Sequence, residues 1–110
     1  MPARIYFVKD TLHIVMSQLE SIKRMLVIIQ KVRSGRRYIS QQELLNEVND
    51  SMEIRGYKDI SGKTLERDFR HIEEAYGLTI GFDVKLGCYA IKEDLSNREE
   101  RLEELLFNFG

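Results

Sequence analysis

The sequence predicts a small α+β domain that is mainly helical, because three helical patterns are followed by a pattern of two short strands. The helical patterns cover residues 17–34, 40–52 and 61–76. The stretch LTIGFDVKLGCYAI (78–91) then alternates like two strands around a turn. Three helices followed by a β-hairpin describe a winged helix-turn-helix domain, in which the hairpin is called the wing. We expect this domain over residues 17–92.

The first helix is expected to begin at Ser17, because Ser17 and Glu20 have the spacing of a capping box. Apolar residues follow three or four positions apart, which is typical of the buried face of a helix. They are Leu19, Ile22, Leu26, Ile29 and Val32. Gly35 then ends the helix.

The residues before this helix show no clear helical or strand periodicity, and they contain the only proline of the chain. The segment IYFV (5–8) could pair as a strand or wrap around the body. Met16 offers an alternative start, in which case the preceding residues are dispensable. We therefore expect residues 1–16 to form a loosely attached N-terminal arm.

A second capping box, Ser40 with Glu43, begins the next helix. Its buried stripe is expected to consist of Leu44, Leu45, Val48 and Met52. Tyr38 and Ile39, just before the cap, look like a short strand. Residues 53–60 connect this helix to the third, and the segment is longer than the short turn of a compact helix-turn-helix.

The third helix separates into two faces when residues 61–76 are placed at about 100° per residue. One face is apolar and can pack on the core: Leu65, Phe69, Ile72 and Tyr76. The opposite face can meet phosphates: Lys63, Thr64, Arg67, Arg70 and His71. Ser61 caps the helix, and together with Lys63 it makes a seat for a phosphate at the helix N-terminus. Asp68 lies at the edge of the apolar face, where we expect it to orient Arg67 or to pair with a basic residue of a neighbouring helix.

The wing is expected to turn between Asp83 and Gly87, because Gly87 can adopt a positive φ. Lys85 at the tip points outward, where it could contact DNA or remain solvated.

Behind the wing, Ser96 and Glu99 form a third capping box. Apolar residues follow at helical spacing: Leu102, Leu105, Leu106 and Phe109. We expect residues 93–110 to form an additional C-terminal helix that serves as a linker to a further domain or as a dimerisation element. Its apolar stripe could also fold back on the core.

Several classes of protein are excluded by the composition and the motifs. With one cysteine, Cys88, and two histidines, His13 and His71, the chain has no internal disulfide and no ligand set for a structural metal. The run GKT (62–64) resembles the end of a P-loop, but Tyr57 stands where that loop needs its first glycine. We therefore expect no cofactor, no catalytic residue and no enzyme activity.

The sequence also indicates a cytoplasmic protein without a membrane segment. The longest apolar run, MLVII (25–29), is too short to span a bilayer. The N-terminus lacks the charged head, apolar stretch and cleavage site of a secretory signal. A single cysteine fits a reducing compartment.

Charge is distributed unevenly along the chain. The net charge of −1 argues against a strongly basic nucleic-acid binder. Residues 17–38, however, carry six positive charges and one negative charge, whereas residues 93–110 carry two positive and six negative charges. Arg33, Arg36 and Arg37, around the end of the first helix, could clamp a DNA backbone or offset the helix dipole.

These motifs together resemble the N-terminal winged helix of the WYL-domain transcriptional regulators, a bacterial family akin to the DeoR-type repressors. The resemblance covers about residues 17–92 and rests on YISQQELLNEV, SGKTLERDFRHIEEAYGLTIGFD and the wing strand ending GCYAI. The positions that match the family's recognition helix and wing are Ser61, Thr64, Leu65, Arg67, Asp68, Gly87 and Tyr89. The departures are Gly62 in place of a long residue, the extended segment before Ser61, and the absence of a WYL sensor domain after the wing.

The resemblance implies a sequence-specific regulator that binds double-stranded DNA as a homodimer, with the third helix in the major groove and a C-terminal sensor domain that is absent from this chain. Together with the two-faced third helix, it predicts DNA contacts from Ser40, Gln41, Ser61, Lys63, Thr64, Arg67, Arg70, His71 and Lys85. Arg67 is expected to read a base and Lys63 to hold a phosphate. The alternative is a winged-helix protein-interaction module that does not bind DNA.

Overall fold

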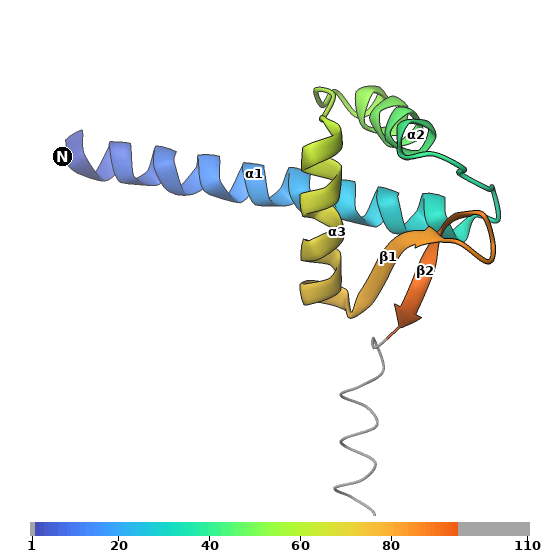
Figure 1. Cartoon of the computed structure of the whole chain (residues 1–110). Coiled ribbons are helices and arrows are strands. Elements are labelled where there is room, and N and C mark those ends of the chain that lie inside the picture. The colour runs from blue at the N-terminus through green and yellow to red at the C-terminus, as the bar shows by residue number, and fades with distance from the viewer. Residues whose placement is uncertain (1, 95–110) are drawn as a thin grey trace, which may run out of the picture.

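Over residues 2–94 the protein is α+β and mainly helical, with three helices followed by a two-stranded antiparallel hairpin (Figure 1). The computed structural model describes residues 2–94, with side chains from residue 17 onward. The elements are α1 (Pro2–Arg33), α2 (Gln41–Ile54), α3 (Gly62–Tyr76), β1 (Leu78–Asp83) and β2 (Cys88–Asp94). This order and packing are consistent with a winged-helix-like arrangement. The expected C-terminal helix falls on residues 95–110, which lie outside the described residues.

Helix α1 is much longer than the sequence pattern predicted, because it starts at Pro2 and runs for 32 residues. Neither the expected arm over residues 1–16 nor a strand at IYFV is found, since residues 2–16 are helical. Proline is well tolerated at the first position of a helix, and no glycine or further proline interrupts this stretch. Ser17 therefore lies inside the helix, and its spacing to Glu20 does not mark a helix start.

The buried face of α1 also differs from the predicted stripe. Leu19, Ile22 and Leu26 were expected in the core, yet they are 42%, 42% and 51% exposed. The buried apolar residues of the helix are instead Met25, Val27, Ile28 and Ile29. The run MLVII can offer more than one face, and the body of the protein docks on the face that also contains Arg24. The predicted burial of Ile29 is confirmed, and Val32 is partly buried against the same core.

Helix α3 begins and ends where the sequence predicted, whereas α2 begins at its predicted cap but continues to Ile54, so Glu53 and Ile54 belong to the helix and not to the connecting segment. The Ser40 hydroxyl accepts a hydrogen bond from the backbone N–H of Glu43 at 3.2 Å, and the Glu43 carboxylate accepts one from the N–H of Ile39. Ser61 caps α3 by accepting from the N–H of Thr64. Gly77 ends α3 with φ of 69°, a left-handed conformation that favours glycine.

A single core joins the last third of α1 to α2, α3 and the hairpin. Its most buried apolar side chains are Tyr38, Ile28, Leu44, Val48, Met52, Leu65 and Ile72. The predicted short strand at Tyr38 and Ile39 is wrong, since this segment makes only one backbone hydrogen bond to the hairpin, from the N–H of Tyr89 to the Tyr38 carbonyl at 2.9 Å. The chain turns into the Ser40 cap immediately afterwards, which leaves no room for a longer ladder.

The hairpin has the predicted turn. Phe82 pairs with Tyr89 and Asp83 with Cys88, and an irregularity interrupts the register between Thr79 and Ile80. The Asp83 carboxylate accepts from the N–H groups of Lys85 and Leu86, at 2.9 and 3.1 Å. Gly87 closes the turn with φ of 70°. The second strand extends to Asp94, two residues beyond the predicted end of the domain at 92.

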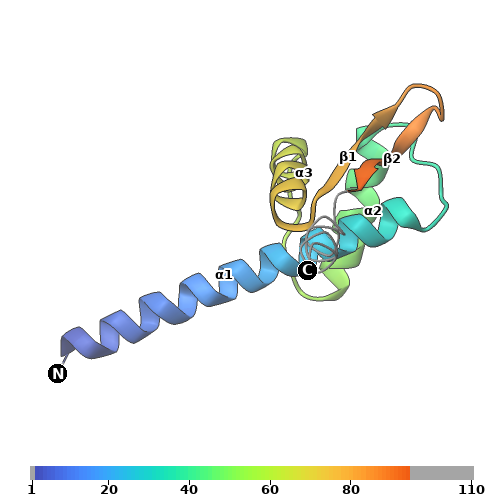
Figure 2. The same cartoon turned by 90° about the horizontal axis from the view of Figure 1, so that it is seen from below.

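The N-terminal half of α1 projects away from the body (Figures 1 and 2). Helix α3 crosses α1, while α2 and the hairpin lie toward its C-terminal end. Within residues 2–94, no helix has the length and hydrophobicity needed to cross a membrane.

Candidate nucleic-acid interface

Helix α3 turns a cationic face to solvent. The side chains of Lys63, Arg67 and Arg70 are exposed, and none of them forms a hydrogen bond or ion pair with another side chain or backbone group within residues 17–94. Thr64, on the same face, is half-buried. On the opposite side of α3, Leu65 and Ile72 are fully buried. The helix therefore separates into the two faces that its periodicity predicted.

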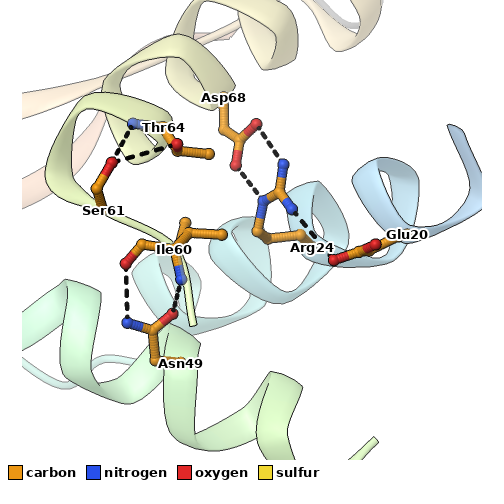
Figure 3. Close-up of polar contacts among 7 residues, drawn as sticks. All are labelled: Glu20, Arg24, Asn49, Ile60, Ser61, Thr64 and Asp68. Carbon is orange, nitrogen blue, oxygen red and sulfur yellow. Dashed lines mark hydrogen bonds and ion pairs between the residues drawn. The ribbon is translucent and has the colours of Figure 1, made fainter. Parts of the chain in front are cut away.

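A buried ion pair fixes the rotation of α3 on α1 (Figure 3). Asp68 is 1% exposed and accepts from two nitrogens of Arg24, with the Nη2 to Oδ1 distance at 3.1 Å. Glu20 lies one helical turn before Arg24, with its carboxylate 3.9 Å from the guanidinium. Of the two roles expected for Asp68, pairing with a basic residue of a neighbouring helix is the one observed. Because Asp68 points inward, Arg67 beside it points outward.

The long segment between α2 and α3 is held by one amide side chain (Figure 3). Asn49 in α2 accepts from the N–H of Ile60 at 2.9 Å and donates to the Ile60 carbonyl at 3.2 Å. This clamp sets where Ser61 begins α3. Asn49 was not predicted from the sequence, where its one signal is a polar residue with an amide side chain in the interior of a helix, a position that such residues seldom favour.

The residues expected to donate to phosphates at the two helix starts also have roles within the protein. The hydroxyl groups of Ser61 and Thr64 lie 3.3 Å apart, and Ser40 caps α2. Gln41 reaches from α2 to α3, where its amide donates to the Gly62 carbonyl at 3.4 Å and to Glu66 at 3.3 Å. Gly62 lies beside this side chain, and a Cβ there would be 3.4 Å from Gln41 Oε1, which is an ordinary contact distance.

His71 lies on the side of α3 that turns toward α1. It lines a shallow hollow whose other members belong to α1: Ser17, Gln18, Ser21, Ile22 and Met25. His71 is exposed. It therefore borders the cationic face rather than occupying its centre, which is formed by Lys63, Arg67 and Arg70.

The three arginines around the end of α1 bind other parts of the domain. Arg33 lies 3.8 Å from the Asp94 carboxylate, and Arg36 pairs with Glu47. Arg37 donates to the carbonyl of Leu86 in the turn of the hairpin. Lys85 is exposed in this same turn. Arg33 and Arg37 thus contact the hairpin, whereas Arg36 contacts α2. Arg37 and Lys85 are two positively charged residues at the turn of the hairpin.

No protein-family model, curated protein or solved structure matches this chain. The resemblance to the WYL-domain regulators therefore stays a prediction that rests on the sequence motifs.

Proposed function

We propose that this protein is a sequence-specific regulator that binds double-stranded DNA, with α3 in the major groove and the hairpin against the neighbouring backbone. The observation that carries the proposal is the cationic face of α3. Lys63, Arg67 and Arg70 project to solvent without partners among the described side chains, on a helix held in place by the buried Asp68. Such side chains can donate to phosphates and to guanine O6 and N7.

The roles of individual residues follow from their places on α3. Arg67 lies at the middle of the cationic face, where we assign it to base reading. Lys63 lies in the first turn, beside backbone N–H groups that favour an anion, so we assign it to a phosphate. Arg70 belongs to the same face, while His71 and Lys85 flank it, and we assign all three to contacts with the DNA backbone.

A DNA-binding role of this kind fits a homodimeric transcriptional regulator of the cytoplasm, similar to the WYL family. One small winged domain buries little surface on DNA, so two copies that read two half-sites would bind more tightly than one.

The test is selection of duplexes from a random DNA pool, followed by fluorescence anisotropy on the selected duplex at several salt concentrations. We expect the double variant Lys63→Ala/Arg67→Ala to lose measurable binding. Any weak binding that remains should have a salt slope lower by about 1, since Lys63 is the one of the two assigned to a phosphate and each phosphate contact contributes about 1.

Lys23→Ala/Arg55→Ala is the matched control, because it removes two positive charges from exposed residues that line a hollow between α1 and α2. This variant should bind DNA almost as well as the wild type. Equal affinity and equal salt slope for the two double variants would refute the proposal.

A second candidate function is supported by the apolar tip of the hairpin. Phe82, Val84 and Leu86 are 41%, 86% and 52% exposed, which is unusual for a wing that only contacts phosphates. These side chains suit a protein partner, as expected for a winged-helix interaction module. In that case Val84→Glu would abolish partner binding, while Lys63→Ala/Arg67→Ala would not.

A further inference from the structure

Three large apolar side chains lie exposed along one side of α1. Leu19, Ile22 and Leu26 are 42%, 42% and 51% exposed, and they are three and four residues apart. The body of the protein leaves them about half exposed, because it packs mainly on the face of α1 that contains Arg24, Met25 and Ile28. They form an apolar stripe that the body meets only at its edges within residues 17–94, where Ile22 borders the hollow with His71 and Leu26 borders the hollow with Arg55.

Since α1 starts at Pro2, the same spacing can be followed toward the N-terminus, which corrects the expectation that these residues have no clear periodicity. Ile5, Val8, Leu12 and Val15 extend the alternation of three and four residues, so that seven apolar positions fall at the two core positions of a heptad repeat over residues 5–26. The backbone is helical over this whole stretch. We call these seven positions the heptad stripe. Three consecutive heptads are the length at which such a repeat begins to indicate a coiled coil.

We propose that the heptad stripe pairs with the same stripe of a second copy of this chain, so that α1 forms a two-stranded coiled coil. A heptad repeat packs best against another helix with a heptad repeat. In such a pair, the core side chains of each helix insert between those of the facing helix. A second copy supplies such a helix by symmetry. Within residues 17–94, the other two helices bury their apolar faces in the core, so neither of them can cover the stripe.

The position of the heptad stripe on the molecule leaves space for a second copy of α1. The next residue in the series, Ile29, is 7% exposed and belongs to the core, so the exposed part of the series ends at Leu26. Residues 5–26 span about 33 Å at 1.5 Å per residue. Because the N-terminal half of α1 projects from the body in both views, a second helix can lie along that half without displacing α2, α3 or the hairpin (Figures 1 and 2).

The pairing is independent of DNA binding, because it concerns a different helix and is measured without DNA. Analytical ultracentrifugation of the full chain at micromolar concentrations should give twice the mass of one chain. The variant Leu12→Glu/Leu19→Glu should give the mass of a single chain, because it places charges within the seam. Its circular dichroism should still show the α2, α3 and hairpin fold, since the core begins after Leu19.

The control is Ile54→Glu/Val84→Glu, which adds the same two charges at apolar residues that are 88% and 86% exposed and lie outside the stripe. It should remain dimeric, and its melting temperature should rise with protein concentration as for the wild type. The variant Leu105→Glu/Phe109→Glu tests the C-terminal segment as the alternative occupant. A monomeric wild type, a dimer that survives Leu12→Glu/Leu19→Glu, or a dimer lost in either of the other two variants would overturn the proposal.

Discussion

Arg24 of α1 and Asp68 of α3 form an ion pair that is almost completely removed from solvent, with the two residues 5% and 1% exposed. The guanidinium donates to both carboxylate oxygens, so the contact fixes direction as well as distance. Asp68 immediately follows Arg67, which is exposed. The pair therefore determines which side of α3 faces solvent, and with it the orientation of the proposed DNA-binding face.

Removing one partner of this pair should destabilise the protein strongly. Asp68→Ala leaves a buried guanidinium without its carboxylate, and such losses cost about 3–5 kcal/mol. The double variant Arg24→Met/Asp68→Leu removes both charges, and we expect it to cost less than Asp68→Ala alone. The free energies of unfolding of the two variants can be measured by urea denaturation followed by circular dichroism.

Glu20→Gln is the control for this comparison. Its carboxylate is 3.9 Å from Arg24, but its side chain is 36% exposed, so the change should cost less than about 1 kcal/mol. The interpretation of Asp68 as the residue that fixes α3 fails if Asp68→Ala is no more destabilising than Glu20→Gln.

The Asn49 clamp gives a second prediction. Asn49→Ala removes both hydrogen bonds to Ile60 and leaves two half-buried backbone groups without partners, so it should cost about 1–3 kcal/mol. Asn49→Asp keeps the acceptor for the Ile60 N–H but loses the donor to the Ile60 carbonyl. Its free energy of unfolding should therefore lie between those of Asn49→Ala and the wild type.

Asn46→Ala serves as the matched change in the same helix. Asn46 is exposed and accepts only from Gln42, at 2.8 Å, so its removal should change the free energy of unfolding by less than about 0.5 kcal/mol. Hydrogen exchange adds a local measurement, because the Ile60 amide should exchange faster in Asn49→Ala and not in Asn46→Ala. Unchanged exchange at Ile60 would contradict the clamp.

The parts of the fold that local rules specify were predictable from the sequence. The caps at Ser40 and Ser61 and the stop at Gly77 each depend on a few neighbouring residues, and each was found at its predicted position. The two faces of α3 were also predictable, because one strongly amphipathic helix of this length has only one face that can be buried.

Features that depend on tertiary packing were not predictable. In α1 the apolar residues form two overlapping sets, and the sequence alone does not say that Met25 and Ile28 face the body while Leu19 and Leu26 face solvent. Ser17 and Glu20 have the spacing of a capping box, but they do not begin a helix because α1 already starts at Pro2. The Arg24–Asp68 pair and the Asn49 clamp join residues 44 and 11 positions apart, which no local pattern connects.

Replacing Gly77 by alanine should destabilise the junction between α3 and the hairpin. Gly77 has φ of 69°, and an L-residue in this conformation costs about 1–2 kcal/mol. Gly62→Ala is the matched change at the other end of α3, where φ is not positive and alanine favours the helix. Thermal denaturation should show a lower melting temperature for Gly77→Ala and little change for Gly62→Ala. Equal effects of the two substitutions would contradict the conformational explanation.

The pH dependence of stability should carry a contribution from the acidic pair at the end of α2. The pKa of Glu53 is raised above its usual value of 4.5, first by a hydrogen bond with the side chain of Asp59 and then by the charge of Asp59. The folded protein thus binds this proton more tightly than the unfolded chain does. The resulting stabilisation is fully present below the unfolded pKa and is lost as the pH rises through the folded pKa.

Glu53→Gln should therefore raise the melting temperature relative to the wild type near pH 7, where two neighbouring carboxylates repel, and the difference should shrink at pH 4, where Glu53 is protonated. Glutamine can also keep the hydrogen bond to Asp59. Glu74→Gln makes the same chemical change at an exposed residue of α3 and controls for the loss of one negative charge. A difference between Glu53→Gln and the wild type that stays constant from pH 4 to pH 7 would show that Asp59 does not raise the pKa of Glu53 in the folded state.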